Sequence, residues 1–199
     1  PILIIYDPRL EENKKDEIQE LVQSIDIAPT ILDLAGIKIP DSMQGKDFQP
    51  LLTGQDVSWR EYAFGENLWA NHFGNPRCES VRTKDWKYIR YFKNEFIASY
   101  EEREDKYQVT DEEATKYQEH LYSTIKGEEP IYEELFYLKE DPHEVNNLIG
   151  DNKYQDKLNE LREKCQELVT EARGGDELPA VLSLSLERQR LFKKVIPED

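Results

Sequence analysis

The stretch SIDIAPTILDLAGIKIP (residues 24–40) constrains the fold most strongly, because it predicts a short helix with a defined beginning and end. Asp26 suits the N-terminal cap, and Pro29 is tolerated in the first turn, where its missing N–H has no helical partner. Gly36 suits the left-handed conformation in which many helices end. The apolar positions recur at helical spacing: Ile27, Ile31, Leu34 and Ala35.

An apolar run stands before this helix. Residues 1–6 (PILIIY) are rich in Ile and Leu, which suits a strand buried on both faces of a parallel sheet. Residues 9–18 are polar and predict a surface loop, and residues 19–25 (QELVQSI) predict another short strand. A strand, a loop and a capped helix in succession are typical of α/β folds. Because one strand cannot make a sheet, we expect its partners to be absent from this chain or to come later in it.

The rest of the chain predicts antiparallel strands with helices packed on them. Residues 39–55 contain Pro and Gly with little periodicity and predict an ordered irregular segment. Strand composition returns at residues 60–69, and residues 78–92 predict a hairpin with a short polar turn. Residues 132–138 (YEELFYL) predict one more strand.

Two helices are expected in this second part. Thr110 and Glu113 form a capping-box pattern before residues 114–125, whose apolar positions recur at helical spacing until Gly127. Residues 153–173 have a longer core-facing stripe. Its members alternate steps of four and three residues: Tyr154, Leu158, Leu161, Cys165, Leu168 and Ala172.

These elements divide the chain. Residues 1–55 predict one strand and one helix of a main α/β layer, and residues 56–175 predict an antiparallel α+β subdomain. The strongly charged residues 93–129 form a helical insertion in that subdomain, and residues 176–199 are a tail. The predicted fold class is therefore an α/β fragment followed by an antiparallel α+β C-terminal subdomain.

Composition excludes several classes of function. The 199 residues carry 42 Asp and Glu against 26 Lys and Arg, a formal net charge of −16, which excludes a nucleic-acid-binding protein with clustered positive charge. No apolar run approaches the roughly 18 residues that span a membrane. Cys78 and Cys165 show no zinc-site spacing, and the sequence leaves open whether they form a disulfide.

The sequence holds no recognisable catalytic motif. It has no G-x-S-x-G elbow and no Gly-rich phosphate loop. Residues 141–144 (DPHE) predict a turn rather than a metal site, because Asp-Pro followed by polar residues favours turns. Asp7 ends the first predicted strand, where α/β enzymes place ligands, but Pro8 also makes it an ordinary strand exit.

Residues 65–82 (GENLWANHFGNPRCESVR) predict a loop between two strands, a location that often carries binding groups. Aromatic faces suit stacking on sugar rings, and arginine suits carboxylate and sulfate groups. The alternative is a hairpin loop whose His and Arg satisfy neighbouring carbonyl and carboxylate groups. The candidate substrate-binding residues are Glu66, Asn67, His72, Arg77 and Arg82.

Successive blocks of the chain resemble the later part of type I sulfatases of the alkaline phosphatase superfamily. Residues 26–36 fit D-x-x-P-T-x-x-x-x-A-G, and residues 40–52 fit P-x-x-x-x-G-x-x-x-x-x-L-L. Residues 82–89 fit the hairpin pattern R-T-x-x-x-K-Y-I, and residues 134–148 fit E-L-x-x-L-x-x-D-P-x-E-x-x-N-L. The order of the blocks makes the resemblance more specific than any one of them.

This resemblance implies an alkaline phosphatase-like fold and a sulfatase acting on sulfated carbohydrates or aryl sulfates, of which this chain is the C-terminal segment. Such sulfatases use a formylglycine, made in a Cys/Ser-x-Pro/Ala-x-Arg motif, and a calcium ion. This chain contains no such motif. We therefore expect no catalytic or metal-binding residue here, a missing N-terminal catalytic part as partner, and a sulfated small molecule or glycan as ligand. The resemblance also implies a periplasmic or secreted location.

Two other interpretations stay open. One is a phosphoester or phosphonate hydrolase of the same superfamily, and the other is a non-catalytic sugar-binding module. A C-terminal segment of a larger enzyme predicts an exposed apolar surface along residues 2–5 and 27–34. A module that stands alone predicts a stable monomer instead.

Overall fold

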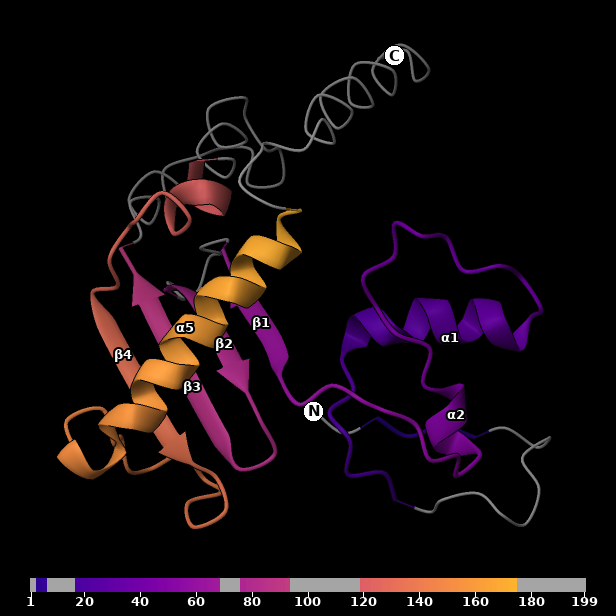
Figure 1. Ribbon diagram of the computed structural model, residues 1–199, viewed down its shortest axis with the longest axis horizontal. Coiled ribbons are helices and arrows are strands. Elements are labelled where there is room, and N and C mark those ends of the chain that lie inside the picture. Colours follow the sequence, from indigo (N-terminus) through magenta and orange to yellow (C-terminus); the bar gives the residue numbers. More distant parts are fainter. Residues whose placement is uncertain (1–2, 7–16, 69–75, 94–118, 175–199) are drawn as a thin grey trace, which may run out of the picture.

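The computed structural model describes residues 3–6, 17–68, 76–93 and 119–174. Figure 1 shows two parts, the first with helices α1 and α2 and the second with a sheet crossed by helix α5. In the described part of the chain, no helix combines the length and the apolar character needed to cross a bilayer.

The second part is built on a four-stranded antiparallel sheet. Its strands are β1 (Ala63–Asn67), β2 (Arg77–Arg82), β3 (Trp86–Phe92) and β4 (Tyr132–Tyr137). Strands that follow one another in the sequence are also neighbours in the sheet. The structure thus confirms the predicted hairpin and the strand predicted on either side of it.

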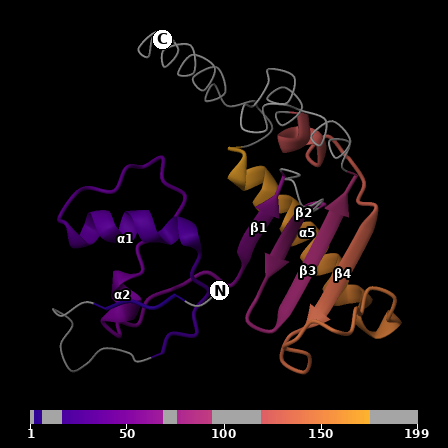
Figure 2. The same ribbon diagram turned by 180° about the vertical axis from the view of Figure 1, so that it is seen from behind.

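Helix α5 (Gln155–Ala172) covers one face of the sheet, and Figure 2 shows the opposite face. The short 3-10 helix η2 (Asn152–Tyr154) leads into it. The carboxylate of Asp151 caps this start by accepting a hydrogen bond from the N–H of Lys153 at 2.9 Å. At the other end Gly174 has a φ of +76°, the left-handed conformation that glycine adopts cheaply.

The main core lies between α5 and the sheet. Its fully buried members are Val81, Tyr88, Leu135, Leu158, Leu161 and Cys165. The predicted stripe of α5 is confirmed, with one difference near its end. Val169 is fully buried there, whereas Leu168 is only partly buried against the core.

The opposite face of the sheet carries a smaller apolar cluster, formed by Ile89, Phe136 and Leu138 with Cys78 and Tyr91 packed against it. Successive strand residues point to opposite faces, so Tyr88 and Ile89 belong to different clusters. Cys78 and Cys165 therefore lie on opposite sides of the sheet, and both are free thiols. The open question of their pairing is settled: they form no disulfide with each other.

The first part contains the 3-10 helix η1 (Ser24–Asp26), α1 (Ile27–Leu34) and α2 (Gln49–Leu52). The helix predicted from the opening stretch is confirmed, and Gly36 ends it with a φ of +69°. This part has its own small core of Phe48, Leu51 and Leu52.

Two predicted strands do not form among the described residues. Residues 3–6 and 19–23 lie outside the sheet, and residues 1–2 lie outside the described residues. Ile4 and Tyr6 are each 86% exposed. A strand requires a hydrogen-bonded neighbour, and β1 to β4 pair only with one another. The apolar run therefore has the composition of a buried strand, but no described strand pairs with it.

Helix α1 leaves two of its apolar positions exposed, as expected if the chain is a segment of a larger protein. Ile27 and Ile31 are 38% and 59% exposed, whereas Pro29 and Thr30 are buried. The Thr30 hydroxyl accepts a hydrogen bond from the N–H of Phe48 at 3.0 Å. A polar contact thus joins the buried side of α1 to Phe48, while Ile27 and Ile31 stay exposed.

The predicted charged insertion and the tail fall largely beyond what the structure describes. Residues 94–118 and 176–199 lie outside the described residues. The end of the predicted second helix is described: residues 119–123 are helical, and Gly127 follows with a φ of +95°.

We expect Leu161→Ala to lower the free energy of unfolding by about 2–5 kcal/mol, because it removes a fully buried side chain between α5 and the sheet. Urea titration followed by circular dichroism measures this change. Glu163→Ala is the matched control, since Glu163 is exposed on the same helix and should change stability by about 0.5 kcal/mol or less. Equal urea midpoints for the two variants would contradict the packing described here.

Candidate functional site

Residues 68–76, here called the β1–β2 connection, join two neighbouring strands at one end of the sheet. Glu66 and Asn67 end β1, and Arg77 begins β2. Three of the predicted substrate-binding residues therefore flank this connection. His72 lies outside the described residues.

Arg82 lies at the other end of β2, where it is exposed and pairs across the sheet with Ala63 and Lys87. A strand rises about 3.3 Å per residue, so Arg82 and Arg77 are roughly 16 Å apart along β2. The structure does not bring Arg82 together with the other described candidates.

Arg77 is 1% exposed although it carries a charge. Its Nε donates to the carbonyl of Lys93 at 3.2 Å, and its Nη1 donates to the hydroxyl of Ser123 at 3.1 Å. Its Nη2 forms an ion pair with Glu128. The guanidinium also lies over the Phe92 ring, 5.3 Å from its centroid. All three guanidinium nitrogens are therefore used by groups of this chain, as the alternative interpretation of the loop describes.

The carboxylate that faces Arg77 is held in its charged form. Burial raises the pKa of Glu128, but hydrogen bonds from Arg77 and Ser123 outweigh it and keep the pKa below its ordinary value. The ion pair is therefore fully charged at neutral pH.

A second buried ion pair joins Glu79 of β2 to Arg90 of β3. The Arg90 Nε donates to Glu79 Oε2 at 2.8 Å, and the Thr124 hydroxyl donates to Glu79 Oε1 at 2.9 Å. The Arg90 Nη2 donates to the Gln166 side chain at 3.0 Å. Because a buried charge requires both a partner and hydrogen bonds, this pair ties β2, β3, residues 119–127 and α5 together.

Arg173, directly after α5, completes the arrangement. Its two terminal nitrogens donate to the two carboxylate oxygens of Glu66, with Nη1 at 3.1 Å from Oε1, and its Nε donates to the carbonyl of Leu121 at 3.0 Å. A bidentate arginine–carboxylate pair fixes geometry as well as adding stability. Ion pairs thus hold both strands that adjoin the β1–β2 connection.

We call the three ion pairs and their two hydrogen-bonding neighbours the polar layer: Glu66, Arg77, Glu79, Arg90, Thr124, Glu128, Gln166 and Arg173.

The cysteines are poor candidates for nucleophiles. Burial raises the pKa of the Cys78 thiol, and burial raises the pKa of Cys165 to about 12. The thiolate is the reactive form, so both residues are unreactive near neutral pH.

The DPHE segment forms the predicted turn. The Asp141 carboxylate accepts hydrogen bonds from the N–H groups of Val145 at 2.9 Å and Asn146 at 2.8 Å. Across the described ranges, no group of three or more His, Cys, Asp and Glu side chains is placed to hold a metal ion. Asp7 lies outside those ranges.

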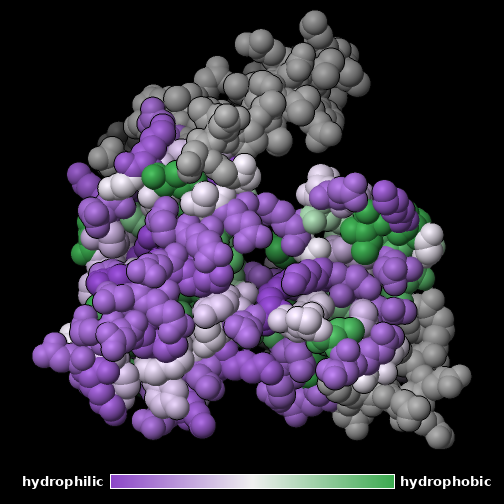
Figure 3. Space-filling model, viewed as in Figure 1, coloured by the Kyte–Doolittle hydropathy of each residue, from purple (hydrophilic) through white to green (hydrophobic). Residues whose placement is uncertain are grey.

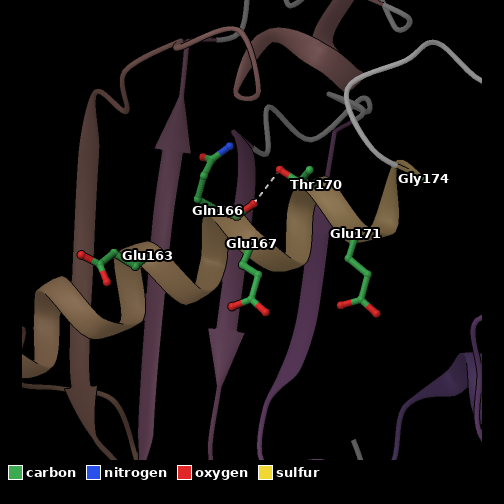
Figure 4. Close-up of a pocket in the computed structure, with 6 residues that line it drawn as sticks. All are labelled: Glu163, Gln166, Glu167, Thr170, Glu171 and Gly174. Atoms are coloured by element: carbon green, nitrogen blue, oxygen red, sulfur yellow. Dashed lines mark hydrogen bonds between the residues drawn. The ribbon is translucent and has the colours of Figure 1, made fainter.

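Figure 4 shows a cleft of about 790 Å³ along the exposed side of α5. Glu163, Glu167 and Glu171 line it at intervals of four residues, and the last two project to the same side. A surface of this charge repels sulfate and phosphate groups. This cleft is therefore not a candidate site for an anionic substrate.

Asp26, predicted as a helix cap, makes no cap hydrogen bond to α1 and is instead the fully buried anchor of the first part. It accepts hydrogen bonds from Arg60 Nη1 at 2.5 Å and Nη2 at 2.7 Å, and from the N–H groups of Gln23 at 2.7 Å and Lys46 at 2.8 Å. These donors come from three separate segments, so no local sequence pattern could have revealed them. Gly45 precedes Lys46, one of these donors. A Cβ at this position would lie 2.0 Å from the carbonyl oxygen of Ile25, so only glycine fits there without a clash.

Comparison with known proteins identifies a matching family model and several similar proteins. A family model described as "N-sulphoglucosamine sulphohydrolase, C-terminal" matches residues 1–129. An arylsulfatase of Clostridium perfringens is 30% identical over 175 residues, which cover 87% of this chain and 27% of that protein. The chain therefore spans about a quarter of the length of this curated relative.

Two solved structures share the fold. A putative sulfatase of Bacteroides thetaiotaomicron has a TM-score of 0.51 and 25% identity, over 74% of this chain and 24% of that one. The second structure, of a protein in complex with its substrate D-glucosamine-2-N,6-O-disulfate, has a TM-score of 0.50 and 25% identity, over 76% of this chain and 25% of that one. These similarities confirm the predicted fold class and the predicted resemblance to the C-terminal part of sulfatases.

We expect Asp26→Asn to lower the free energy of unfolding of the first part by about 3 kcal/mol at pH 7, because Arg60 would lose its carboxylate partner in a nearly buried site. Burial raises the pKa of Asp26, but hydrogen bonds from Arg60, Gln23 and Lys46 outweigh it and hold the pKa below its ordinary value of 3.8. The stabilisation is therefore complete above the unfolded-state pKa and is lost as the pH falls through the folded-state pKa.

Urea midpoints measured from neutral pH down to about pH 3 test this expectation. The difference between the native protein and Asp26→Asn should shrink below about pH 4. The control is Asp33→Asn, an exposed position on α1, which should show no comparable change. A difference in urea midpoint that stays constant down to the lowest pH would contradict the proposed anchor role of Asp26.

Proposed function

Because this chain belongs to the N-sulphoglucosamine sulphohydrolase C-terminal family, we propose that it forms the C-terminal part of a sulfatase that hydrolyses sulfate esters. The family match over residues 1–129 is the observation that carries this proposal. The relatedness to an arylsulfatase of Clostridium perfringens supports it. In this proposal the chain supplies scaffold and one wall of the substrate pocket, while bond cleavage belongs to groups elsewhere in the protein.

An exposed apolar surface supports a larger protein. Its members on and beside α1 are Ile25, Ile27, Ile31 and Ile37, and residues 3–6 add Leu3, Ile4 and Ile5. Figure 3 shows apolar residues gathered over α1. Exposed apolar patches mark contact surfaces, and this one matches the surface expected for a segment joined to a larger enzyme. In this proposal, the N-terminal catalytic part of the protein packs over this apolar surface.

The β1–β2 connection is the proposed wall of the substrate pocket. Asn67 and His72 are the proposed substrate contacts, and Glu66 and Arg77 are positioning residues that hold the ends of the connection through the polar layer. Rigid support of this kind matters because small displacements of binding groups reduce rates strongly. Arg82, at the other end of β2, is a further proposed substrate contact.

Calcium and formylglycine are proposed for the remainder of the enzyme. The formylglycine would supply the nucleophile and the calcium ion would stabilise negative charge on the sulfate. The described residues do not fit a metal site, because no suitable cluster of His, Cys, Asp and Glu exists among them.

The proposed substrate is a sulfated carbohydrate. The relative solved with D-glucosamine-2-N,6-O-disulfate supports this class. The net charge of −16 opposes the approach of anions over long distances, but charge is screened beyond about 8–10 Å, so local groups decide binding. A periplasmic or secreted location is part of the same proposal.

The decisive experiment uses the full-length protein that contains this chain. We expect it to release sulfate from 4-nitrophenyl sulfate and from sulfated glucosamine, and we expect the isolated chain to release none. A preference for phenyl phosphonate esters would favour the hydrolase alternative. Turnover by the isolated chain, or binding of sugars by a protein that hydrolyses no ester, would overturn the proposal.

We expect Arg77→Lys in that protein to lower kcat/KM by about 10- to 100-fold, mainly through KM, because lysine cannot replace the three guanidinium hydrogen bonds that fix the connection. Arg162→Lys is the matched control. Arg162 makes a more exposed pair with Glu133 of β4, which lies at the sheet edge opposite β1, at 2.6 Å from Oε2. Its change should leave KM within about twofold. Equal effects of the two variants would show that Arg77 contributes stability alone.

A further inference from the structure

A second cleft, of about 490 Å³, lies between the two parts of the molecule. Val57 and residues 59–62 line one side, and the turn between β2 and β3 lines the other. This places the cleft at the end of the sheet opposite the β1–β2 connection. Its volume falls within the range of roughly 300–1,000 Å³ that is usual for small-ligand sites.

The cleft is lined by aromatic side chains that are held in place. The Trp59 Nε1 donates to a backbone carbonyl at 2.9 Å, and the Tyr62 hydroxyl donates to Glu160 at 3.3 Å. Trp86 stacks on Tyr137 with ring centroids 4.5 Å apart. Trp59, Tyr62 and Trp86 stay partly exposed. Such rings can bind the apolar face of a sugar with little loss of conformational freedom.

The charges of the cleft disfavour an anionic ligand. Two of its basic side chains are already paired, Arg60 with Asp26 and Lys157 with Glu160. Lys84 then faces more carboxylates than it can neutralise, since acidic residues also line the cleft. A sulfate or carboxylate ligand would be repelled here.

The rim of the cleft carries polar groups suited to hydroxyls. Glu61, Lys84 and Asp85 are exposed, and the structure gives their side chains no hydrogen bond or ion pair to another described residue. Carboxylates accept hydrogen bonds from hydroxyl groups, and an ammonium group donates to them. Fixed rings combined with such groups match a ligand that has one apolar face and many hydroxyls.

We propose that this cleft binds a neutral, hydroxyl-rich sugar unit of a carbohydrate chain, away from the reacting sulfate ester. The preference for carbohydrate over other hydroxyl-rich ligands rests on the proposed sulfatase function. The cleft and the β1–β2 connection adjoin opposite ends of β2, roughly 16 Å apart. An oligosaccharide is long enough to contact both.

The test measures equilibrium binding of two unsulfated probes, cellotriose and chitotriose, to the full-length protein by tryptophan fluorescence and saturation-transfer NMR. These probes contain no sulfate ester, so the result is independent of turnover. We expect the double substitution Lys84→Ala/Asp85→Ala to weaken binding by about tenfold, because it removes hydrogen-bonding groups at the rim. Trp59→Phe should weaken it as well, through the loss of ring area.

The matched control is Lys139→Ala/Glu140→Ala, an adjacent basic–acidic pair that is exposed in the turn after β4. It should leave binding within about twofold. Binding that is lost in His72→Ala but kept in Lys84→Ala/Asp85→Ala would place the sugar at the β1–β2 connection and overturn the proposal. No binding of either probe, by a protein that still hydrolyses sulfate esters, would overturn it while leaving the sulfatase proposal intact.

Discussion

The ion pair between Glu79 and Arg90 is the interaction on which the sheet and its helices depend. Both side chains are buried, so neither charge is tolerated without the other. Thr124 and Gln166 supply the remaining hydrogen bonds, which brings residues 119–127 and α5 onto the same face of the sheet. Apolar packing of Leu161 and its neighbours provides most of the stabilisation. The ion pair adds a requirement that Thr124 and Gln166 lie beside β2 and β3 in the folded protein.

The polar layer also changes how charged residues near the β1–β2 connection are interpreted. An arginine beside a loop suggests an anion contact, yet Arg77 is buried with every nitrogen engaged. Arg173, which carried no functional signal in the sequence, pairs with Glu66 and holds the end of β1. The connection therefore begins and ends at fixed points. The charged side chains at these two points are therefore engaged in holding the strands in position.

Elements with a clear local period were predicted well. The hairpin, β4 and α5 follow from alternation or helical spacing within short windows, and Gly36 ends its helix as expected. The predicted strand at residues 1–6 failed in its described portion, because strand formation depends on a partner that this sheet does not offer. Ile27 and Ile31 of α1 are exposed for a related reason: no described element packs over them.

The sequence by itself determined the order of the elements, the family blocks and the lack of a catalytic motif, because these depend on short-range spacing and residue chemistry. Only the tertiary structure decided that Asp26 is an anchor rather than a cap, that Arg77 and Arg82 lie at opposite ends of β2, and that Trp59, Tyr62 and Trp86 share one cleft. Burial and ion pairing join residues far apart in the chain, and local patterns carry no record of such partners.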